Sequence, residues 1–231
     1  MPRLSEVLRS LLFYVVFYLG SVLVVSNAVV MLFAGSEAMF RTAVRAWAGY
    51  HRWCVVHLLG IAVAIEGTTP PAGTLIAIKH ESFFEAIDLP FMLDNPVVFA
   101  KAQLLRIPLW GLAGTRYGLV AVEREAGASA LRRMIASARR LGAGGRLLAI
   151  FPEGTRIPHG QRPPLQAGFA GLYKLLGREV VPVAVLSGPF YHRWIKRRGT
   201  IRVVFGEPIP AGLPRDQIER RVGEAINALN I

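Results

Sequence analysis

The beginning of the chain has the hydrophobic pattern of a membrane helix. Residues 11–35 contain no charged side chain, whereas the short stretch before them carries Arg3 and Arg9. A bilayer crossing takes about 20 apolar residues, so this run is long enough to span one. It exceeds the roughly 7–15 apolar residues of a cleaved signal peptide, and no small-x-small cleavage site closes it. We therefore predict a retained membrane anchor.

A second helix is predicted from Glu37 to about Ile65, and its pattern mixes charge with aromatic rings. Such side chains suit the headgroup layer, where an apolar body lies in lipid and a polar tip stays hydrated. A helix packed on the following domain has the same pattern. If both helices serve the membrane, the first is either spanning or re-entrant, and both alternatives stay open. The side chains concerned are Arg41, Arg45, Trp47, Tyr50, His51, Arg52, Trp53 and His57.

The turn cluster Gly67–Gly73 divides the chain into a membrane-associated helical segment, residues 1–66, and a domain, residues 67–231. Beyond the cluster, β-rich runs alternate with helical stretches, which is typical of an α/β fold. We predict a mixed, largely parallel sheet flanked by helices. The expected strands are Leu75–Ile78, Val97–Ala100, Leu119–Val122, Leu147–Phe151, Val180–Leu186 and Ile201–Phe205. The expected helices are Phe83–Leu93, Ser129–Leu141, Leu165–Leu176 and Arg215–Leu229.

The charge balance points to an anionic partner. The 231 residues include 27 Lys and Arg against 15 Asp and Glu, a formal net charge of +12. Such a surface attracts nucleic acid, anionic lipid headgroups or a phosphorylated substrate. A hydrophobic content of 53% and a mean hydropathy of +0.41 favour membrane lipid and argue against nucleic acid. The single cysteine, Cys54, excludes an intrachain disulfide and a cysteine-based metal cluster.

A histidine with carboxyl groups downstream follows the first predicted strand of the domain. His80 can act as a general base near neutral pH if a carboxylate fixes its tautomer and stabilises the imidazolium. Three candidates follow it: Glu81, Glu85 and Asp88. Ser82 and Glu85 have the spacing of a capping box, which starts a helix at the next residue and leaves His80 outside it. Alternatively, Glu85 only caps the helix and His80 is an ordinary loop histidine.

The segment Phe-Pro-Glu-Gly-Thr-Arg, residues 151–156, is a second candidate site. A proline and a glycine after an apolar strand turn the backbone sharply, at the strand end where open α/β sheets bind ligands. This turn presents Glu153, Gly154, Thr155 and Arg156. Arg156 can bind a phosphate in bidentate fashion, and Thr155 can add a hydroxyl. An ion pair between Glu153 and Arg156 alone is the alternative.

Two further basic residues, Lys101 and Arg124, follow two other predicted strands. If those strands are parallel to the others, both residues reach the same edge of the sheet as Arg156, and the three form an anion pocket. A serine hydrolase is a poor fit, because the sequence has no Gly-x-Ser-x-Gly nucleophile elbow. The basic aromatic loop Tyr191–Arg198 suits anionic lipid or the phosphates of a substrate.

Four segments resemble the four motifs of the glycerophosphate acyltransferase superfamily, in order and rough spacing. The resemblance covers roughly residues 37–210, and the whole chain is similar to the bacterial 1-acyl-sn-glycerol-3-phosphate acyltransferases of that superfamily. The segments are His80 with Glu85 five residues later, the Gly111 region flanked by Lys101 and by Glu123 and Arg124, residues 151–156, and residues 180–185.

The resemblance implies an acyl transfer from a thioester to the free hydroxyl of lysophosphatidic acid. His80 is then the general base, Glu85 orients its ring, and Lys101 and Arg156 hold the phosphate. Gly154 and Glu153 shape the pocket, with Thr155 and Arg124 as further substrate-binding candidates. The fourth segment, Val180–Leu186, lines an acyl or thioester site or is simply a core strand. No metal is expected, because apart from His80 and Glu85 the histidines of the sequence have no close ligand pairing with carboxylates. No cofactor is expected, since the acyl donor is a co-substrate.

The chain departs from the motif of the family at two positions. The family usually has Asn before the histidine and Asp as the acid, where this chain has Lys79 and Glu85. Glutamate is one methylene longer and still reaches the ring, so we expect Glu85 as the partner of His80, with Asp88 as the alternative.

The expected partners are membrane lipid, a lysophospholipid acceptor, and acyl-CoA or acyl carrier protein as donor; no nucleic acid is expected. The basic N-terminal stretch favours an inner-membrane location with the catalytic domain facing the cytoplasm. Three alternatives stay open: acylation of a lyso-aminolipid, acylation of glycerol 3-phosphate, and a non-enzymatic basic protein that binds membrane surfaces.

Overall fold

The computed structural model describes residues 3–123 and 127–230. Its centre is a seven-stranded sheet in the order β1-β7-β6-β2-β5-β3-β4. Neighbouring strands are parallel except β6 and β7, so the predicted mixed, largely parallel sheet is confirmed. The strands are β1 (Ile61–Glu66), β2 (Leu75–Ile78), β3 (Val97–Lys101), β4 (Leu119–Val122), β5 (Leu148–Ile150), β6 (Val180–Leu186) and β7 (Gly199–Phe205).

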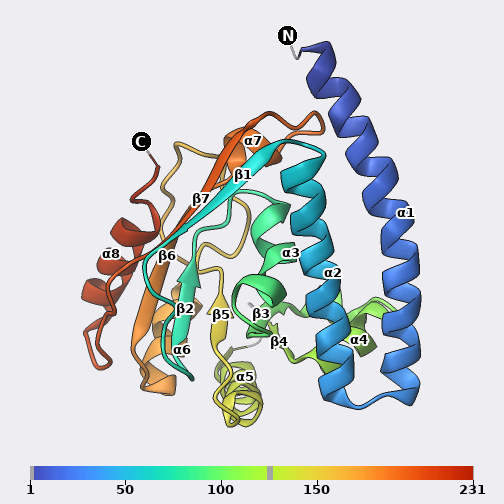
Figure 1. Ribbon diagram of the computed structural model, residues 1–231. Helices are drawn as coiled ribbons and strands as arrows, with labels where there is room; N and C mark the ends of the chain where they lie inside the picture. Colours follow the sequence, from blue (N-terminus) through green and yellow to red (C-terminus); the bar gives the residue numbers. More distant parts are fainter. Residues whose placement is uncertain (1–2, 124–126, 231) are drawn as a thin grey trace.

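Helices cover both faces of this sheet (Figure 1). The four predicted helices of the domain are present as α3, α5, α6 and α8, whereas η1, α4 and α7 were not predicted. The helices are α1 (Leu4–Ala34), α2 (Glu37–His57), α3 (Phe83–Met92), η1 (Ala102–Arg106), α4 (Trp110–Tyr117), α5 (Gly127–Gly142), α6 (Ala167–Leu176), α7 (Gly188–Tyr191) and α8 (Arg215–Ile226).

The central strand β2 separates two hydrophobic cores. Ile76 and Ile78 pack in the core shared with α2 and α3, while Leu75 and Ala77 pack in the core shared with α5, α6 and α8. Successive side chains of a strand point to opposite faces of the sheet. A strand whose two faces are both covered therefore carries apolar side chains at every position. All four residues of β2 are buried accordingly.

The prediction that the second helix reaches Ile65 is wrong. The helix α2 ends at His57, and Gly60 turns the chain with a φ of +68°. The residues Ile61–Glu66 then form β1, which pairs with β7 in parallel. Branched side chains at every second position favour this edge strand once β7 offers it a partner. The boundary predicted at residue 66 therefore lies after the first strand of the sheet.

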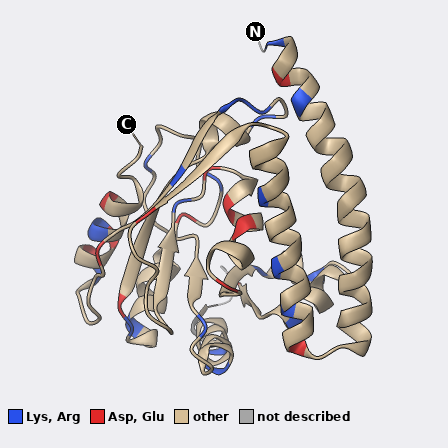
Figure 2. Cartoon of the chain, in the orientation of Figure 1, with Lys and Arg blue, Asp and Glu red and all other residues tan. Residues whose placement is uncertain are grey.

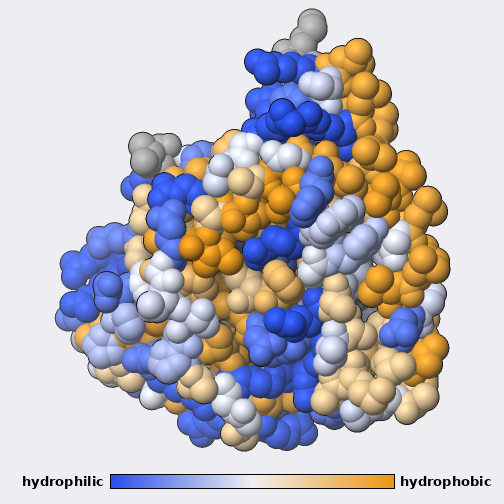
Figure 3. All heavy atoms as spheres, viewed as in Figure 1, coloured by the Kyte–Doolittle hydropathy of each residue, from blue (hydrophilic) through white to orange (hydrophobic). Residues whose placement is uncertain are grey.

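The helices α1 and α2 lie side by side next to the sheet (Figure 1). Among the described residues, α1 is the one helix long and apolar enough to cross a membrane. Its outward side is apolar over most of its length, as the orange band in Figure 3 shows, and includes Leu19 and Leu23. Its other side buries Phe13 and Phe17 in the core.

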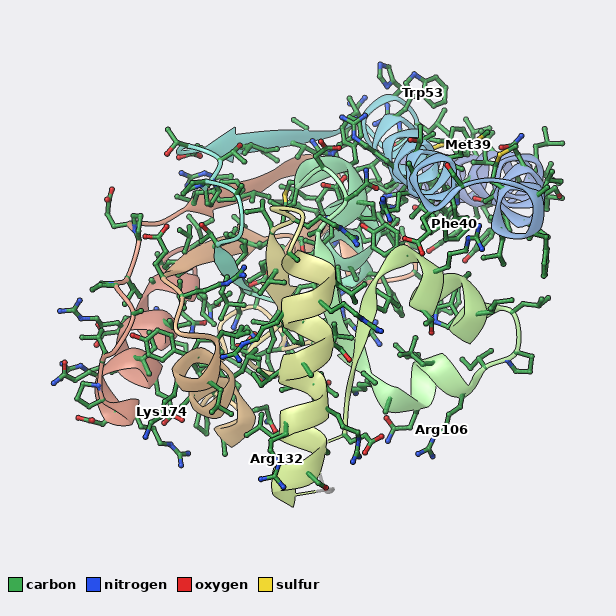
Figure 4. All side chains as sticks on the ribbon, turned by 90° about the horizontal axis from the view of Figure 1, so that it is seen from below. Met39, Phe40, Trp53, Arg106, Arg132 and Lys174 are labelled. Atoms are coloured by element: carbon green, nitrogen blue, oxygen red, sulfur yellow. The ribbon has the colours of Figure 1, made fainter. Side chains whose placement is uncertain are left out.

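The helix α2 combines the two roles that its sequence left open. Phe40 is buried in a cluster with Leu32 and Tyr117, whereas Met39 and Trp53 are about half exposed. Figure 4 shows Trp53 and Met39 on the outer side of the helix pair. One face of α2 therefore packs on the domain, and the other continues the exposed apolar surface of α1.

Candidate active site

His80 lies in the loop between β2 and α3, where the parallel strands β2, β5 and β3 all end. Ser82 caps the helix, because its Oγ accepts a hydrogen bond from the Phe84 amide at 3.1 Å. The Glu85 carboxylate accepts in return from the Ser82 amide, at 3.1 Å and 3.2 Å to its two oxygens. The predicted capping box is thus present, and it leaves His80 outside the helix.

Of the three candidate carboxylates, Glu85 is the one that faces His80. Its Oε2 lies 3.9 Å from the His80 Nδ1. Asp88 instead binds Arg52 of α2 through both of its oxygens, with 2.7 Å between Oδ1 and the Arg52 Nε. This pairing joins the acidic α3 to the basic side of α2, which lie together in Figure 2. Asp88 is therefore occupied by a structural ion pair.

Glu81 is buried on the far side of the same loop. Its Oε1 lies 2.9 Å from the His159 Nδ1, and its Oε2 accepts the amides of Ser187 and Gly188 at 2.9 Å and 2.8 Å. Glu81 therefore anchors the start of α7, and its oxygens are used in doing so.

The Glu85 carboxylate is surrounded by donors. Besides the Ser82 amide, it accepts from the Glu81 amide at 3.0 Å, from the Ser82 Oγ at 3.0 Å and from the Ser187 Oγ at 2.6 Å. Burial raises the pKa of Glu85 to about 7, and these hydrogen bonds oppose the rise. The carboxyl group is thus fixed in orientation and titrates close to neutral pH.

The His80 ring is held by stacking. It lies against Phe151 with 4.1 Å between the ring centroids. Its Nδ1 is buried and makes no hydrogen bond to any described residue. Burial, together with the positive charges of Arg156 and Lys101, lowers the pKa of His80 to about 3. The imidazole is therefore neutral at physiological pH, which is the form that can accept a proton.

A cavity of about 980 Å³ opens beside the ring. Its wall is mostly apolar and is built from α1, α2, α4, α5 and the strand ends. His80, Lys101, Thr155 and Arg156 are among the few polar residues on it, together with Gly154 of the same loop. Arg156 lies over the Phe83 ring, with 3.8 Å from its Cζ to the ring centroid. The cavity thus combines a long apolar space with cationic groups beside the imidazole.

The family that this site belongs to follows from the sequence comparison. The sequence model described as "Acyltransferase" matches residues 61–186, more than half of the chain. The chain belongs to the acyltransferase family. The match begins at Ile61 and therefore includes the strand β1.

Two curated bacterial relatives carry the name 1-acyl-sn-glycerol-3-phosphate acyltransferase. The chain is 30% identical to the Pseudomonas aeruginosa protein over 76% of its own length and 70% of that protein. It is 28% identical to the Helicobacter pylori protein over 58% of its length and 57% of that protein. The match to the Helicobacter protein therefore leaves more than a third of that protein uncovered.

A solved structure has the same fold. The 1-acyl-sn-glycerophosphate (LPA) acyltransferase PlsC from Thermotoga maritima aligns over 97% of this chain and 95% of its own, with a TM-score of 0.70 and 20% identity. The alignment covers nearly the whole of both chains, so the shared fold includes the N-terminal helices as well as the sheet.

One predicted site residue of this acyltransferase lies away from the cavity wall, and the structure does not describe another. Glu153 does not line the cavity: it is buried behind the loop, where its Oε1 lies 2.6 Å from the Lys79 Nζ. Among the described residues Glu153 thus forms its ion pair with Lys79, and not with Arg156 as the alternative prediction had it. Arg124 lies outside the described residues. Within the described part of the chain, no group of three or more His, Cys, Asp or Glu side chains is placed to hold a metal ion.

Three residues that complete this site were given no role in the prediction, although Phe151 belongs to the predicted segment of residues 151–156. Ser187 binds Glu85, Phe151 stacks on His80, and Phe83 lies under Arg156. Ser187 carries a usable signal, because it is a small polar residue directly after a buried strand of the parallel set. The two phenylalanines carry none, since an apolar residue beside a strand or at the start of a helix predicts core packing.

Proposed function

We propose that this acyltransferase moves a fatty acyl group from a thioester donor to the free hydroxyl of lysophosphatidic acid, forming phosphatidic acid. The observation that carries the proposal is the neutral, largely buried imidazole of His80 at an apolar cavity of about 980 Å³ whose wall also holds Arg156 and Lys101. A lysophosphatidate presents the matching groups: a hydroxyl, an acyl chain and a phosphate. The names of the relatives support the same acceptor.

In the proposed reaction, His80 removes the proton of the acceptor hydroxyl as its oxygen attacks the thioester carbonyl. The new ester C–O bond forms, the C–S bond breaks, and the imidazolium returns the proton to the leaving thiolate. Glu85 stabilises the imidazolium and fixes the ring. The distance of 3.9 Å between Glu85 and Nδ1 shortens in the reacting complex, since catalytic hydrogen bonds are often long without substrate.

Arg156 and Lys101 are proposed to hold the phosphate, with Gly154 and Thr155 at the turn beside them. Arg156 is exposed and ends on the cavity wall, and a guanidinium binds a phosphate through two parallel hydrogen bonds. Arg124 stays a candidate for the same role. The apolar remainder of the cavity is proposed to take the acyl chain.

The protein is proposed to act at the inner membrane with its catalytic domain on the cytoplasmic side. α1 contacts the domain near both of its ends: the Ser10 Oγ accepts from the Lys196 amide at 2.9 Å, and Leu32 packs with Tyr117 of α4. A helix tied to the domain along its length suits a re-entrant position with its apolar face in one leaflet. Trp194, which is 83% exposed, extends that face.

An assay of the purified full chain in phospholipid vesicles tests this function. Lysophosphatidic acid, a lyso-aminolipid and glycerol 3-phosphate serve as acceptors, each with acyl-CoA and with acyl carrier protein as donor. We expect lysophosphatidic acid to have the highest kcat/KM with at least one donor. A preference for another acceptor would reassign the substrate, and no transfer from either donor would favour the membrane-surface binding protein.

Arg156→Ala is expected to raise KM for lysophosphatidic acid about 10- to 100-fold, because hydrogen bonds to charged groups contribute about 1.5–3 kcal/mol. The KM for the acyl donor should change little. Arg132→Ala is the matched control, since this arginine projects from α5 away from the cavity (Figure 4). Equal changes in the two Michaelis constants would argue against phosphate binding by Arg156.

The activity is expected to fall as the pH drops below about 7. Burial raises the pKa of Glu85 to about 7, and a protonated Glu85 cannot stabilise the imidazolium. Burial lowers the pKa of His80 to about 3, so the imidazole stays neutral over this range and does not cause the loss. The kcat at saturating substrate, measured with the unfolding temperature at each pH, checks this. A constant kcat down to about pH 5 contradicts it.

A further inference from the structure

A lysine without any exposed surface stands directly before the proposed general base. The Lys79 Nζ donates to three acceptors: the Glu153 Oε1 at 2.6 Å, the Asn227 Oδ1 at 2.8 Å and the Gln161 carbonyl at 3.2 Å. A buried ammonium is tolerated only where acceptors and an opposite charge compensate its loss of water. All three are supplied by segments that lie far away in the sequence.

The ion pair of Lys79 and Glu153 joins the two loops that carry the site. Lys79 precedes His80, and Glu153 lies three residues before Arg156. The second oxygen of Glu153, Oε2, lies 3.4 Å from the amide of His80. The His80 carbonyl, in turn, accepts from the Ile157 amide at 2.7 Å. The backbone of His80 is thus held on both sides by the loop of residues 153–157.

Two asparagines after α8 complete the hydrogen-bond network around Lys79. Asn227 follows α8 and accepts from Lys79, and the Asn230 Nδ2 donates to the same Gln161 carbonyl at 2.7 Å. Asn230 also binds the amide of Gly160 and the side chain of Arg162. Both asparagines are buried. Residues 160–162 are therefore fixed by the C-terminal segment, which also orients the lysine.

We propose that Lys79, Glu153 and Asn227 are positioning residues that fix His80 and Arg156 relative to one another. None of the three lines the cavity, so they act through the backbone of the two loops. The assignment gives Lys79 a role where the motif of the family usually has asparagine. This proposal rests on the proposed function in one respect: the rate of acyl transfer must depend on the position of His80 relative to Arg156.

Lys79→Met tests the assignment in the purified full chain. The misplacement of the base and the phosphate site is expected to lower kcat about 10- to 100-fold. It should also raise KM for lysophosphatidic acid while leaving KM for acyl-CoA unchanged. This variant leaves Glu153 buried without its counter-charge, so a loss of stability accompanies the loss of rate.

A double variant separates rate from stability. In Lys79→Met/Glu153→Leu no buried charge is left uncompensated, so the unfolding temperature should recover toward that of the wild type while kcat stays low. Ile218→Ala near the start of α8 is the control: it opens a cavity in the core, lies outside the cavity wall, and should lower the unfolding temperature with kcat unchanged. A double variant with the kcat of the wild type would overturn the assignment.

A measurement without acyl transfer distinguishes this proposal from the proposed function. Diethyl pyrocarbonate modifies neutral imidazoles, and mass spectrometry reports the rate at His80 alone. The double variant is expected to react several-fold faster than the wild type, because the ring is no longer held against Phe151. An unchanged rate would overturn the positioning role. If the wild type transfers no acyl group but diethyl pyrocarbonate modifies His80 faster in the double variant, the proposed function is wrong and the positioning role is still supported.

Discussion

His80→Ala is expected to lower kcat for acyl transfer about 10³-fold or more, close to the full contribution of a general base. The imidazole is the neutral base at the cavity wall, and alanine offers no proton acceptor in its place. The fold should persist, because the ring makes no hydrogen bond through Nδ1 within the described part of the chain and mainly stacks on Phe151. The measurement is single-turnover and steady-state transfer from acyl-CoA to lysophosphatidic acid in vesicles.

His57→Ala is the matched control for this variant. His57 is an exposed histidine at the end of α2 that stacks on Trp53, remote from the cavity wall. Its removal should leave kcat within about twofold, as is usual for surface substitutions. Vesicle binding and the unfolding temperature are recorded for both variants. Turnover by folded His80→Ala within tenfold of the wild type would rule out the general-base role.

The helices and strands around the site could be predicted from the sequence, because each depends on a hydrophobic pattern or a capping motif within a few residues. The strands from β2 to β7 are mostly apolar runs, and the capping box at Ser82 marks the start of α3. The edge strand β1 could not be predicted from the sequence. Its residues continue the apolar pattern of α2, and only the parallel pairing with β7 makes them extended.

The hydrogen bonds of the site could be predicted only in part, because many of them join residues that are far apart in the sequence. The positions of His80 and Arg156 after strands predicted that both lie at one edge of the sheet, and both line the cavity there. Spacing favoured Glu85 over Asp88, but it could not supply the physical reason, which is that Arg52 of another helix binds Asp88. The placement of Glu153 depends likewise on Lys79 and on the C-terminal Asn227, which lies 148 residues from that lysine in sequence.

Glu85→Gln is expected to lower kcat by up to about 10⁴-fold with little loss of stability, which is the loss seen where a triad carboxylate becomes an amide. Glutamine is accepted at this position of a capping box, so the amide oxygen can still accept from the Glu81 and Ser82 amides. The new NH₂ group then faces the His80 Nδ1. It donates to that nitrogen and favours the tautomer with hydrogen on Nε2, which cannot remove a proton from the acceptor.

Asp88→Asn separates this effect from the loss of a buried charge. Asp88 is a buried carboxylate of the same helix, three residues further on, and its partner is Arg52 rather than His80. Asparagine weakens that ion pair, so the unfolding temperature should fall while kcat is retained. If Glu85 orients the base, the two variants give opposite patterns: a lost rate with a stable fold, and a retained rate with a weakened one. A folded Glu85→Gln variant with the kcat of the wild type would show that Glu85 does not orient His80, and a kcat lowered equally in Asp88→Asn would show that the effect is not specific to Glu85.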